Sequence, residues 1–377
     1  MGDLLMSSPA IRAVKETLNC KITVLTSSMG QGIAHFITEI DDVIVCDLPW
    51  VKTNEQFNPQ DYVALVEKLK TANYDGAIVF TVYSQNPLPS AMLTYLSGIP
   101  LRLAYCRENP YQLLTDWVAE KEPYTFIRHQ VRRDLDLVAQ INCRTTNEHL
   151  SLEVNKSWWP LLKDKLHELR LNDSKLYIVL HAGVSEQKRQ YPFDSWVETG
   201  KLLLEEFPCQ LVLTGNSAEA KFNDKISAAI GEGAVSVAGK LNLQEFITLI
   251  KHSALVISVN TGTIHIAAAF GRPIIVLYAL TNPQHSPWKV QGEILPFTVA
   301  GHLKSKNEVI KYVNDNLFTS DVSYPNPEHI LEAAKRILTQ KHVRFIPEII
   351  ISADTELQTI GKFSWLPAAP MMNSTIH

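Results

Sequence analysis

The chain has 377 residues, of which 46% are hydrophobic and 20% charged, and its formal net charge is −4. This composition is typical of a globular protein with two domains or one large one, and it argues against broad nucleic-acid binding. No uninterrupted apolar run reaches the roughly 18 residues of a membrane-spanning helix. The N-terminus lacks the basic region and cleavage site of a signal peptide, and five scattered cysteines fit a reducing compartment. We therefore expect a cytoplasmic protein.

The first half of the chain alternates short β-rich runs with helical patterns. Strands are predicted at residues 21–27, 42–47, 76–81 and 100–105, and helices at residues 9–18, 31–39, 61–71 and 89–97. Such alternation is typical of a parallel sheet with helices on both faces. Pro9 is expected at the first position of its helix, where its missing N–H costs nothing.

One strand is missing from this pattern. A first β–α unit should open with an apolar strand, yet Met1 is followed at once by Gly2 and Asp3. We expect the native chain to begin upstream of Met1, and we expect the loss of this central strand to open a slot in the core.

The second half repeats the alternation more clearly. Strands are predicted at residues 176–181, 210–214, 235–238, 254–259 and 274–278, and helices at residues 194–206, 218–230, 243–252 and 263–270. We therefore expect an α/β protein of two doubly wound, Rossmann-like domains, residues 1–155 and 156–342, facing a cleft at the carboxyl ends of their strands. The tail, residues 343–377, shows no clear period and is assigned no role.

The stretch from Ser258 to Trp288 carries the most informative motif. An apolar strand ends in the Asn-Thr-Gly-Thr turn of residues 260–263, a helical segment of small residues follows, and a second apolar run begins at Ile274. Such a turn leaves backbone N–H groups unpaired at the positive end of a helix, which suits a phosphate or diphosphate. The motif indicates a nucleotide-type ligand.

Three segments together resemble the bacterial heptosyltransferases, glycosyltransferase family 9. They are Gly2-Asp3 with PAIRAVK at residues 9–15, the loop HAGVSEQKRQYP at residues 181–192, and VNTGTIHIAAAFGRPIIVLYALTNP at residues 259–283. The resemblance covers about residues 1–340. It implies a GT-B fold, with the nucleotide-sugar donor on the C-terminal domain and the acceptor on the N-terminal one. It also implies an inverting sugar transfer that needs no metal.

Asp3 is the candidate general base. Sugar transfer from a nucleotide diphosphate needs a base for the acceptor hydroxyl. Asp3, at the exit of the missing strand, would face the cleft, and it matches the aspartate of the family's N-terminal signature. The competing interpretation is an aspartate that caps the helix expected to start at Pro9.

The other two motifs supply candidate donor-binding residues. Backbone N–H groups of the turn at residues 261–263 would hold the charge of the departing diphosphate. Lys188 or Arg189 would clamp the diphosphate, and Arg189 matches the family's basic position better, although each is by default a solvated surface charge. Ser185 could donate a hydrogen bond, and His265 is either a pocket residue or a packed histidine. The full candidate set is Ser185, Lys188, Arg189, Asn260, Thr261, Gly262, Thr263 and His265.

Asn260 departs from the family pattern, which has aspartate at this position. Asparagine keeps the size and an acceptor oxygen but loses the negative charge. We expect Asn260 to hydrogen-bond sugar hydroxyls with an altered donor preference, and the alternatives are weaker activity or a lapsed enzyme.

Other motifs are less informative. Asp134 and Asp136 spell the DxD of metal-dependent glycosyltransferases, but their stretch is helical, so the two carboxylates point apart. We interpret them as a solvated helix face and, because no histidines have metal-ligand spacing, we expect no metal. Residues 84–87 and 106–117 are candidates for lining the acceptor site. Trp288 could stack on a nucleobase, but an ordinary packed tryptophan is favoured.

The favoured function is transfer of a sugar such as heptose from a nucleotide-diphosphate donor to a glycan or lipid-linked acceptor. No cofactor is expected, and an ADP-sugar is the favoured donor. Because such acceptors are often amphiphilic, peripheral association with the inner face of the membrane fits this function, and no nucleic-acid partner is expected. The alternatives are a nucleotide-sugar epimerase or hydrolase, or a non-catalytic nucleotide-sugar-binding protein.

Overall fold

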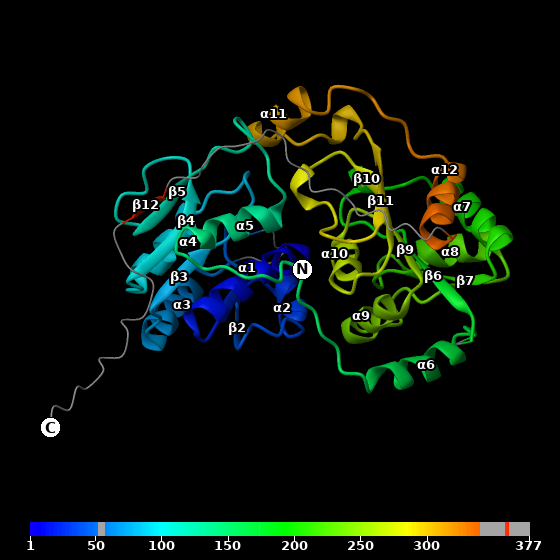
Figure 1. The fold of residues 1–377 in the computed structure, drawn as a ribbon, viewed down its shortest axis with the longest axis horizontal. Coiled ribbons are helices and arrows are strands. Elements are labelled where there is room, and N and C mark those ends of the chain that lie inside the picture. The colour runs from blue at the N-terminus through cyan, green and yellow to red at the C-terminus, as the bar shows by residue number, and fades with distance from the viewer. Residues whose placement is uncertain (52–56, 173, 340–358, 362–377) are drawn as a thin grey trace.

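The computed structural model describes residues 1–51, 57–172, 174–339 and 359–361. These residues form an α/β protein of two halves, each built around parallel strands (Figure 1). The halves face each other across a boundary where the N-terminus lies.

The C-terminal half contains one six-stranded sheet. Its strands lie in the order β11-β10-β9-β6-β7-β8, and every neighbouring pair is parallel. The strands are β6 (Leu176–His181), β7 (Cys209–Thr214), β8 (Ala234–Ser236), β9 (Leu255–Val259), β10 (Ile274–Ala279) and β11 (Gly292–Phe297). Both β9 and β10 are buried throughout, as continuous apolar runs in a parallel sheet must be when helices cover both faces.

Alternate residues of these strands point into two different cores. Val179, Val256 and Val276 join the core with helices α9 and α10, whereas Ile178 and Ile257 join the core with α7, α8 and α12. The helices are α7 (Phe193–Glu206), α8 (Ala220–Ile230), α9 (Leu243–His252), α10 (Gly262–Ala269) and α12 (Pro327–Thr339). Because both faces are packed, the carboxyl edge of this sheet is a rigid platform for a site.

The N-terminal half contains two separate sheets. The first pairs β1 (Thr23–Thr26) with β2 (Asp42–Val45), and the second aligns β3 (Gly76–Val79), β4 (Leu101–Cys106) and β5 (Asp116–Ala119) in parallel. Among the strands that the structure describes, none joins β1 to β3. The helices are α1 (Gly2–Leu18), α2 (Ser28–Ala34), α3 (Pro59–Ala72), α4 (Leu88–Leu96) and α5 (Gln130–Ala139), and α6 (Trp158–Glu168) leads into the C-terminal half.

Helix α1 begins at Gly2, so the prediction that it starts at Pro9 is wrong. Pro9 lies inside the helix, where it has no N–H to donate to the carbonyl oxygen of Leu5. The hydroxyl of Ser8 donates to this carbonyl oxygen at 2.6 Å and thereby satisfies the acceptor that the proline frees. The segment from Leu5 to Val14 is buried, and part of it packs against α5. This burial offsets the cost of an internal proline.

Strands β5 and β11, and two elements near the C-terminus, were not predicted. Strand β12 (Thr359–Gly361) pairs antiparallel with β5, so part of the tail extends the N-terminal sheet, while most of the tail lies outside the described residues. Helix α11 (Glu308–Asn316) packs against the N-terminal half, with 4.9 Å between the ring centroids of Tyr312 and Tyr124. The chain therefore crosses back to the N-terminal half after completing the six-stranded sheet.

Candidate active site

The first turns of α1 and α10 meet at the boundary between the two halves (Figure 1). A Cβ atom on Gly2 would lie 2.9 Å from Cδ2 of His265, and a Cβ atom on Gly262 would lie 3.8 Å from the backbone nitrogen of Gly2. Glycine at position 2 therefore permits an approach of the two helices that any side chain would obstruct. This contact places Asp3, the second residue of α1, beside the turn at residues 261–263.

The carboxylate of Asp3 is exposed in the first turn of α1. Asp3 lies inside a helix whose N-cap is Met1, so the alternative interpretation, a cap on a helix starting at Pro9, is wrong. Burial lowers the pKa of His285, and the nearby charge of Asp3 acts in the opposite direction. The candidate base is thus an accessible carboxylate that faces an imidazole from the other half of the molecule.

The turn after β9 is built as the sequence predicts. Strand β9 ends at Val259, Thr261 is the N-cap of α10, and the side chain of Thr261 makes no capping hydrogen bond. The first turn of a helix has N–H groups without intrahelical partners, and here no side chain caps them. An anion placed at this end of α10 would meet those donors and the positive end of the helix dipole.

Arg189 reaches this turn from the loop after β6. Its Nη1 donates to the carbonyl oxygen of Asn260 at 3.0 Å, and its Nη2 lies 3.2 Å from a carboxylate oxygen of Glu186. The Nε atom is buried and has no hydrogen-bond partner among the described residues. Lys188 pairs with Glu186 at 3.2 Å instead. Of the two basic candidates, Arg189 is therefore the one that the structure brings to the end of β9, and Ser185 is exposed in the same loop.

The side chain of Asn260 bridges β9 and β10. Its Nδ2 donates to the carbonyl oxygen of Ala279 at 3.2 Å and to Oγ1 of Thr281 at 3.3 Å, and its Oδ1 accepts from the N–H of Ala279 at 3.2 Å. An amide matches a backbone N–H and C=O together, whereas a carboxylate has only acceptors. The departure from aspartate therefore has a structural counterpart in this paired contact with β10.

Three buried histidines surround the meeting point of the halves. Burial lowers the pKa of His129 to about 3, and it also lowers the pKa values of His265 and His285. The imidazoles of these residues are therefore neutral near pH 7 and can offer hydrogen bonds but no positive charge. His129 and His285 were missed from the sequence, although His285 directly follows the Thr-Asn-Pro-Gln end of the most specific motif.

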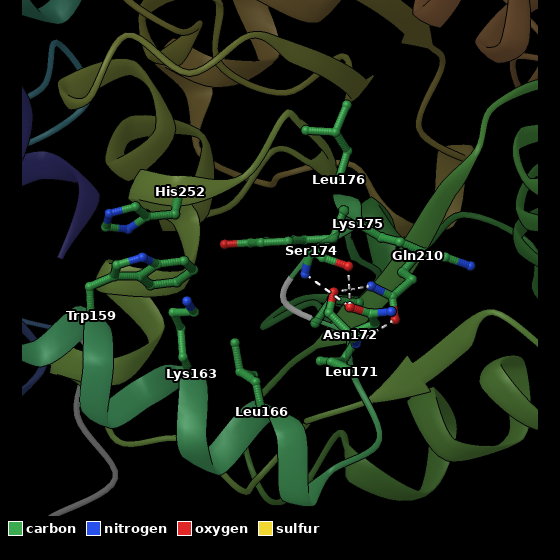
Figure 2. Close-up of a pocket in the computed structure, with 12 residues that line it drawn as sticks. Trp159, Lys163, Leu166, Leu171, Asn172, Ser174, Lys175, Leu176, Gln210 and His252 are labelled. Atoms are coloured by element: carbon green, nitrogen blue, oxygen red, sulfur yellow. Dashed lines mark hydrogen bonds between the residues drawn. The ribbon is translucent and has the colours of Figure 1, made fainter.

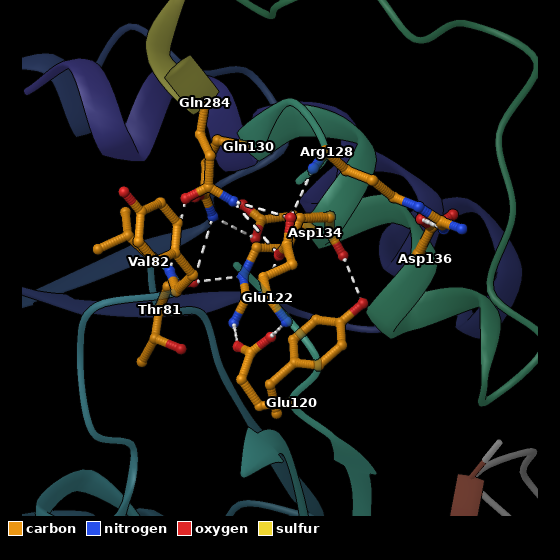
Figure 3. Close-up of polar contacts among 12 residues, drawn as sticks. Thr81, Val82, Glu120, Glu122, Arg128, Gln130, Asp134, Asp136 and Gln284 are labelled. Carbon is orange, nitrogen blue, oxygen red and sulfur yellow. Dashed lines mark hydrogen bonds and ion pairs between the residues drawn. The ribbon is translucent and has the colours of Figure 1, made fainter. Parts of the chain in front are cut away.

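Behind α1, a buried polar network corrects the interpretation of the DxD pair (Figure 3). Both aspartates lie on helix α5 as predicted, but Asp134 is only 1% exposed, so its assignment to a solvated face is wrong. Asp134 Oδ2 accepts from the Ser7 hydroxyl at 2.7 Å, and Oδ1 accepts from Nε2 of Gln130 at 2.8 Å. Asp136 instead pairs with Arg128. The two carboxylates thus point apart, as expected for a helix, but one of them points into the protein.

The segment after β10 anchors the C-terminal half to the N-terminal half. Gln284 donates to both carboxylate oxygens of Glu122 at 3.3 Å, and His129 Nε2 lies 2.7 Å from the carbonyl oxygen of Ser286. Trp288 is 2% exposed, with its ring 4.6 Å from that of His129 between centroids. The expectation of a packed tryptophan is confirmed.

The acceptor-side candidates lie at the carboxyl ends of N-terminal strands. Residues 84–87 form the turn between β3 and α4. The backbone N–H of Tyr83 lies 3.5 Å from Oε1 of Gln284, so this turn borders the other half of the molecule. Residues 106–117 connect β4 to β5 and include the first two residues of β5, which the sequence did not reveal.

The most distinct cavity is elsewhere. It has a volume of about 170 Å³ and lies near the amino ends of β6 and β7, between α6 and α9 (Figure 2). The rings of Trp159 and His252 stack at one side of it, with 3.9 Å between centroids. It is therefore at the opposite edge of the sheet from Asn260 and Arg189, and it is not part of the candidate site.

The described part of the chain contains neither a membrane-spanning helix nor a metal-binding cluster. None of its helices combines the length and apolar character needed to cross a membrane. Within the same residues, no group of three or more His, Cys, Asp or Glu side chains is arranged to hold a metal ion.

Comparison with known proteins places this geometry in a family. Residues 62–309 match glycosyltransferase family 9 (heptosyltransferase). Lipooligosaccharide heptosyltransferase 2 of Haemophilus influenzae is 24% identical over 296 residues, which cover 76% of this chain and 83% of the relative. Lipopolysaccharide heptosyltransferase 2 of Escherichia coli is 22% identical over 356 residues, which cover 90% of this chain and 97% of the relative.

Solved structures show the same architecture. The E. coli ADP-heptose lipopolysaccharide heptosyltransferase II superposes with a TM-score of 0.67 at 20% identity, over 89% of this chain and 95% of that one. A family 9 glycosyltransferase from Veillonella parvula superposes with a TM-score of 0.73 at 16% identity, over 89% and 94% of the two chains. The expected α/β fold of the GT-B type is confirmed.

Proposed function

The chain belongs to glycosyltransferase family 9, the heptosyltransferases, and on this premise we propose that it transfers heptose from an ADP-linked donor to a lipopolysaccharide-type acceptor. Membership of the family makes the protein a glycosyltransferase, which sets aside the epimerase, hydrolase and non-catalytic alternatives. The ADP-linked donor is suggested by solved E. coli heptosyltransferase WaaC with ADP and with ADP-2-deoxy-2-fluoro heptose.

One observation carries the proposal. The first turn of α1, with the exposed carboxylate of Asp3, meets the uncapped first turn of α10, and Arg189 reaches the same turn through the carbonyl oxygen of Asn260. A base and an anion-binding site are thus neighbours, although Asp3 and residues 260–263 lie far apart in the sequence. This is the minimum that sugar transfer from a nucleotide diphosphate requires.

The chemistry follows as a single displacement. Asp3 accepts the proton of the acceptor hydroxyl as that oxygen attacks the anomeric carbon of the donor. The bond between this carbon and the diphosphate oxygen breaks, and the negative charge that develops on the diphosphate is held by the N–H groups of residues 262–263 and by Arg189. Attack opposite the leaving group inverts the anomeric configuration.

We further propose that no metal takes part in this step. The groups that would hold the diphosphate are backbone donors and a guanidinium, which already supply the complement to its charge. Ser185 and Lys188, in the same loop as Arg189, remain candidates for additional donor contacts.

The acceptor is proposed to bind the N-terminal half, with the turn at residues 84–87 on its path. This turn lies at the carboxyl end of β3 and borders Gln284 of the other half. Acceptors of the lipopolysaccharide type are amphiphilic, so a peripheral encounter of the protein with the membrane surface is part of the proposal.

The test is transfer itself. The protein is incubated with ADP-heptose and heptose-deficient lipopolysaccharide, with and without EDTA, and both ADP release and the heptosylated product are followed. We expect product and ADP in equal amounts, unaffected by EDTA, and little turnover with UDP-, GDP- or CDP-linked sugars. ADP release without acceptor would indicate a hydrolase, and loss of product in EDTA would contradict the metal-free mechanism.

A further inference from the structure

The candidate mechanism makes no use of Asp134, a carboxyl group buried directly behind the first turns of α1. It lies on α5 and accepts a 2.7 Å hydrogen bond from the Ser7 hydroxyl (Figure 3). Ser7 is four residues after Asp3 in the same helix, and its hydroxyl also lies 3.3 Å from the Asp3 carbonyl oxygen. Residues four apart share one face of a helix. Asp134 therefore touches the face of α1 that carries Asp3 one turn earlier.

No cation is devoted to Asp134. Arg133, the adjacent residue, forms ion pairs at 2.5 Å with Glu120 and with Glu122, and its Nε donates to Thr81 at 2.8 Å. Asp134 accepts its two hydrogen bonds from neutral donors, Ser7 and Gln130. A buried carboxylate with only neutral donors is costly for stability, and such groups cluster at functional sites.

We propose that Asp134 is a positioning residue of the transfer reaction, whose buried negative charge makes the Asp3 carboxylate a stronger base. This inference rests on the proposed role of Asp3. Two carboxylates that share a poorly solvated region hold protons more tightly than either would alone. The Ser7 hydroxyl fixes the distance between them by joining α5 to the first turns of α1.

The titration of Asp134 agrees with this role. Burial raises the pKa of Asp134 to about 7, hydrogen bonds from Ser7 and Gln130 and the charge of Arg133 act against that rise, and the charge of Asp3 adds to it. The group therefore changes charge within the pH range in which the enzyme is expected to work. Each carboxylate acts on the other, because coupling between two titrating groups is mutual.

Other charges face this pair. On the C-terminal half, His285 and His265 lie nearest to Asp3, and burial lowers the pKa of each. On α1 itself, the Met1 amino group is close to Asp3, and burial lowers its pKa. On the side of α5, Arg133 is held by the two glutamates. None of these groups replaces the negative charge that Asp134 supplies.

Asp134→Asn is the informative variant, because it removes the charge and nearly keeps the shape. Gln130 Oε1 is buried without a partner among the described residues, so rotation of the Gln130 amide would let it accept from the new asparagine. Asp136→Asn is the matched control, since Asp136 lies on the same helix but pairs with Arg128. Asp134→Glu keeps a carboxylate and serves as the rescue variant.

The experiment measures transfer rates from pH 5 to pH 9 with ADP-heptose and heptose-deficient lipopolysaccharide. Thermal unfolding and ADP binding are measured for each variant, to establish that it is folded. For Asp134→Asn we expect the acid limb of the pH–rate profile to move to lower pH by about 0.5–1 unit. Its maximal rate should fall by about three- to tenfold, because a weaker base is a poorer catalyst. Asp136→Asn and Asp134→Glu should keep the native acid limb.

Failure of this inference is distinguishable from failure of the proposed function. If Asp3→Asn abolishes transfer while the folded Asp134→Asn protein keeps the native acid limb, Asp134 is structural only and the inference is overturned. It is also overturned if Asp136→Asn moves the acid limb as far as Asp134→Asn does. If Asp3→Asn retains the native rate, the base is another residue and both proposals fail together.

Discussion

Arg189 donates a hydrogen bond of 3.0 Å from Nη1 to the carbonyl oxygen of Asn260, and so joins the loop after β6 to the end of β9. The guanidinium is thereby fixed beside the first turn of α10, while its buried Nε remains without a protein partner among the described residues. Buried donors are rarely left unpaired, and a diphosphate oxygen is the kind of acceptor that would complete this one.

Arg189→Ala is therefore expected to weaken ADP binding by about 1.5–3 kcal/mol, the scale of a hydrogen bond to a charged group. Lys188→Ala is the matched control, because Lys188 pairs with Glu186 in the same loop, and its effect should stay below about 1 kcal/mol, as for other exposed ion pairs. Calorimetric titration of both variants with ADP measures the difference. Equal losses would mean that the loop contributes only general positive charge.

Gly262→Ala should separate binding from folding. A Cβ atom at this position would meet nothing closer than 3.8 Å, so the folded protein accommodates it. The new methyl group would, however, occupy space at the first turn of α10, where the proposed diphosphate approaches the backbone N–H groups. We expect a native unfolding temperature together with at least about tenfold weaker ADP binding, on the scale of a lost charged hydrogen bond. Native ADP affinity would place the diphosphate elsewhere.

Gly2→Ala is expected to behave in the opposite way. Its Cβ would lie 2.9 Å from Cδ2 of the buried His265, so α1 or the imidazole must move. Overpacking of this kind costs about 1–3 kcal/mol of stability, and a displacement of about 1 Å at Asp3 would reduce the transfer rate by about a hundredfold. Differential scanning calorimetry and rate measurements check both effects. A native rate in a stable Gly2→Ala protein would show that the position of α1 does not matter for transfer.

Asn260→Asp tests whether the departure from the family pattern is structural. Asparagine pairs with both the N–H and the C=O of Ala279, whereas aspartate would face that carbonyl oxygen with a second acceptor. We expect a loss of about 1–3 kcal/mol in the free energy of unfolding, the cost of an unsatisfied buried group. Chemical denaturation at pH 7 measures it. If stability is unchanged and donor preference shifts instead, Asn260 acts mainly on the sugar.

The stability of the Asp134→Asn protein should depend on pH in a defined direction. Asp134 has a pKa of about 7 in the folded protein and an ordinary value of 3.8 otherwise. The folded state therefore binds a proton that the unfolded state releases between these two values, so this group's contribution is greatest below about pH 4 and is lost as the pH rises through about 7. Asparagine does not titrate. Relative to the native protein, Asp134→Asn should gain stability from pH 5 to pH 8.

Thermal unfolding at four pH values across this range measures the trend. Asp164, which is exposed on α6, provides a control in the Asp164→Asn variant, whose curve should run parallel to that of the native protein. Parallel curves for Asp134→Asn and the native protein would show that Asp134 does not titrate in this range.

The C-terminal half was readily predictable because its signals are local. Strand β6 and helix α9 were predicted with the bounds that the structure shows, and β9, α10 and β10 within one residue. Continuous apolar runs that alternate with helical patterns leave few other arrangements. The turn at residues 260–263 was recognisable for the same reason, since strand, turn and helix are consecutive in the sequence.

Errors arose where distant residues decide the structure. Pro9 lies inside α1 because Ser8 satisfies the freed carbonyl oxygen and α5 covers the helix, and neither fact is visible in the local pattern. The burial of Asp134 was not predictable because its partner Ser7 is 127 positions away. Strand β5 was missed because it has only four residues and pairs with β4 and the remote β12. Local periodicity cannot report such contacts.

The central claim is that Asp3 is the base of a metal-free heptosyl transfer. Single-turnover transfer from ADP-heptose to heptose-deficient lipopolysaccharide in EDTA, by the native protein and by Asp3→Asn, tests it most directly. We predict a native rate unaffected by EDTA and a loss of about 10²–10⁴-fold in Asp3→Asn, the usual contribution of a general base, with ADP affinity unchanged. A folded Asp3→Asn protein that transfers heptose within about threefold of the native rate would contradict the claim, because removal of a true base cannot leave the transition state equally stabilised.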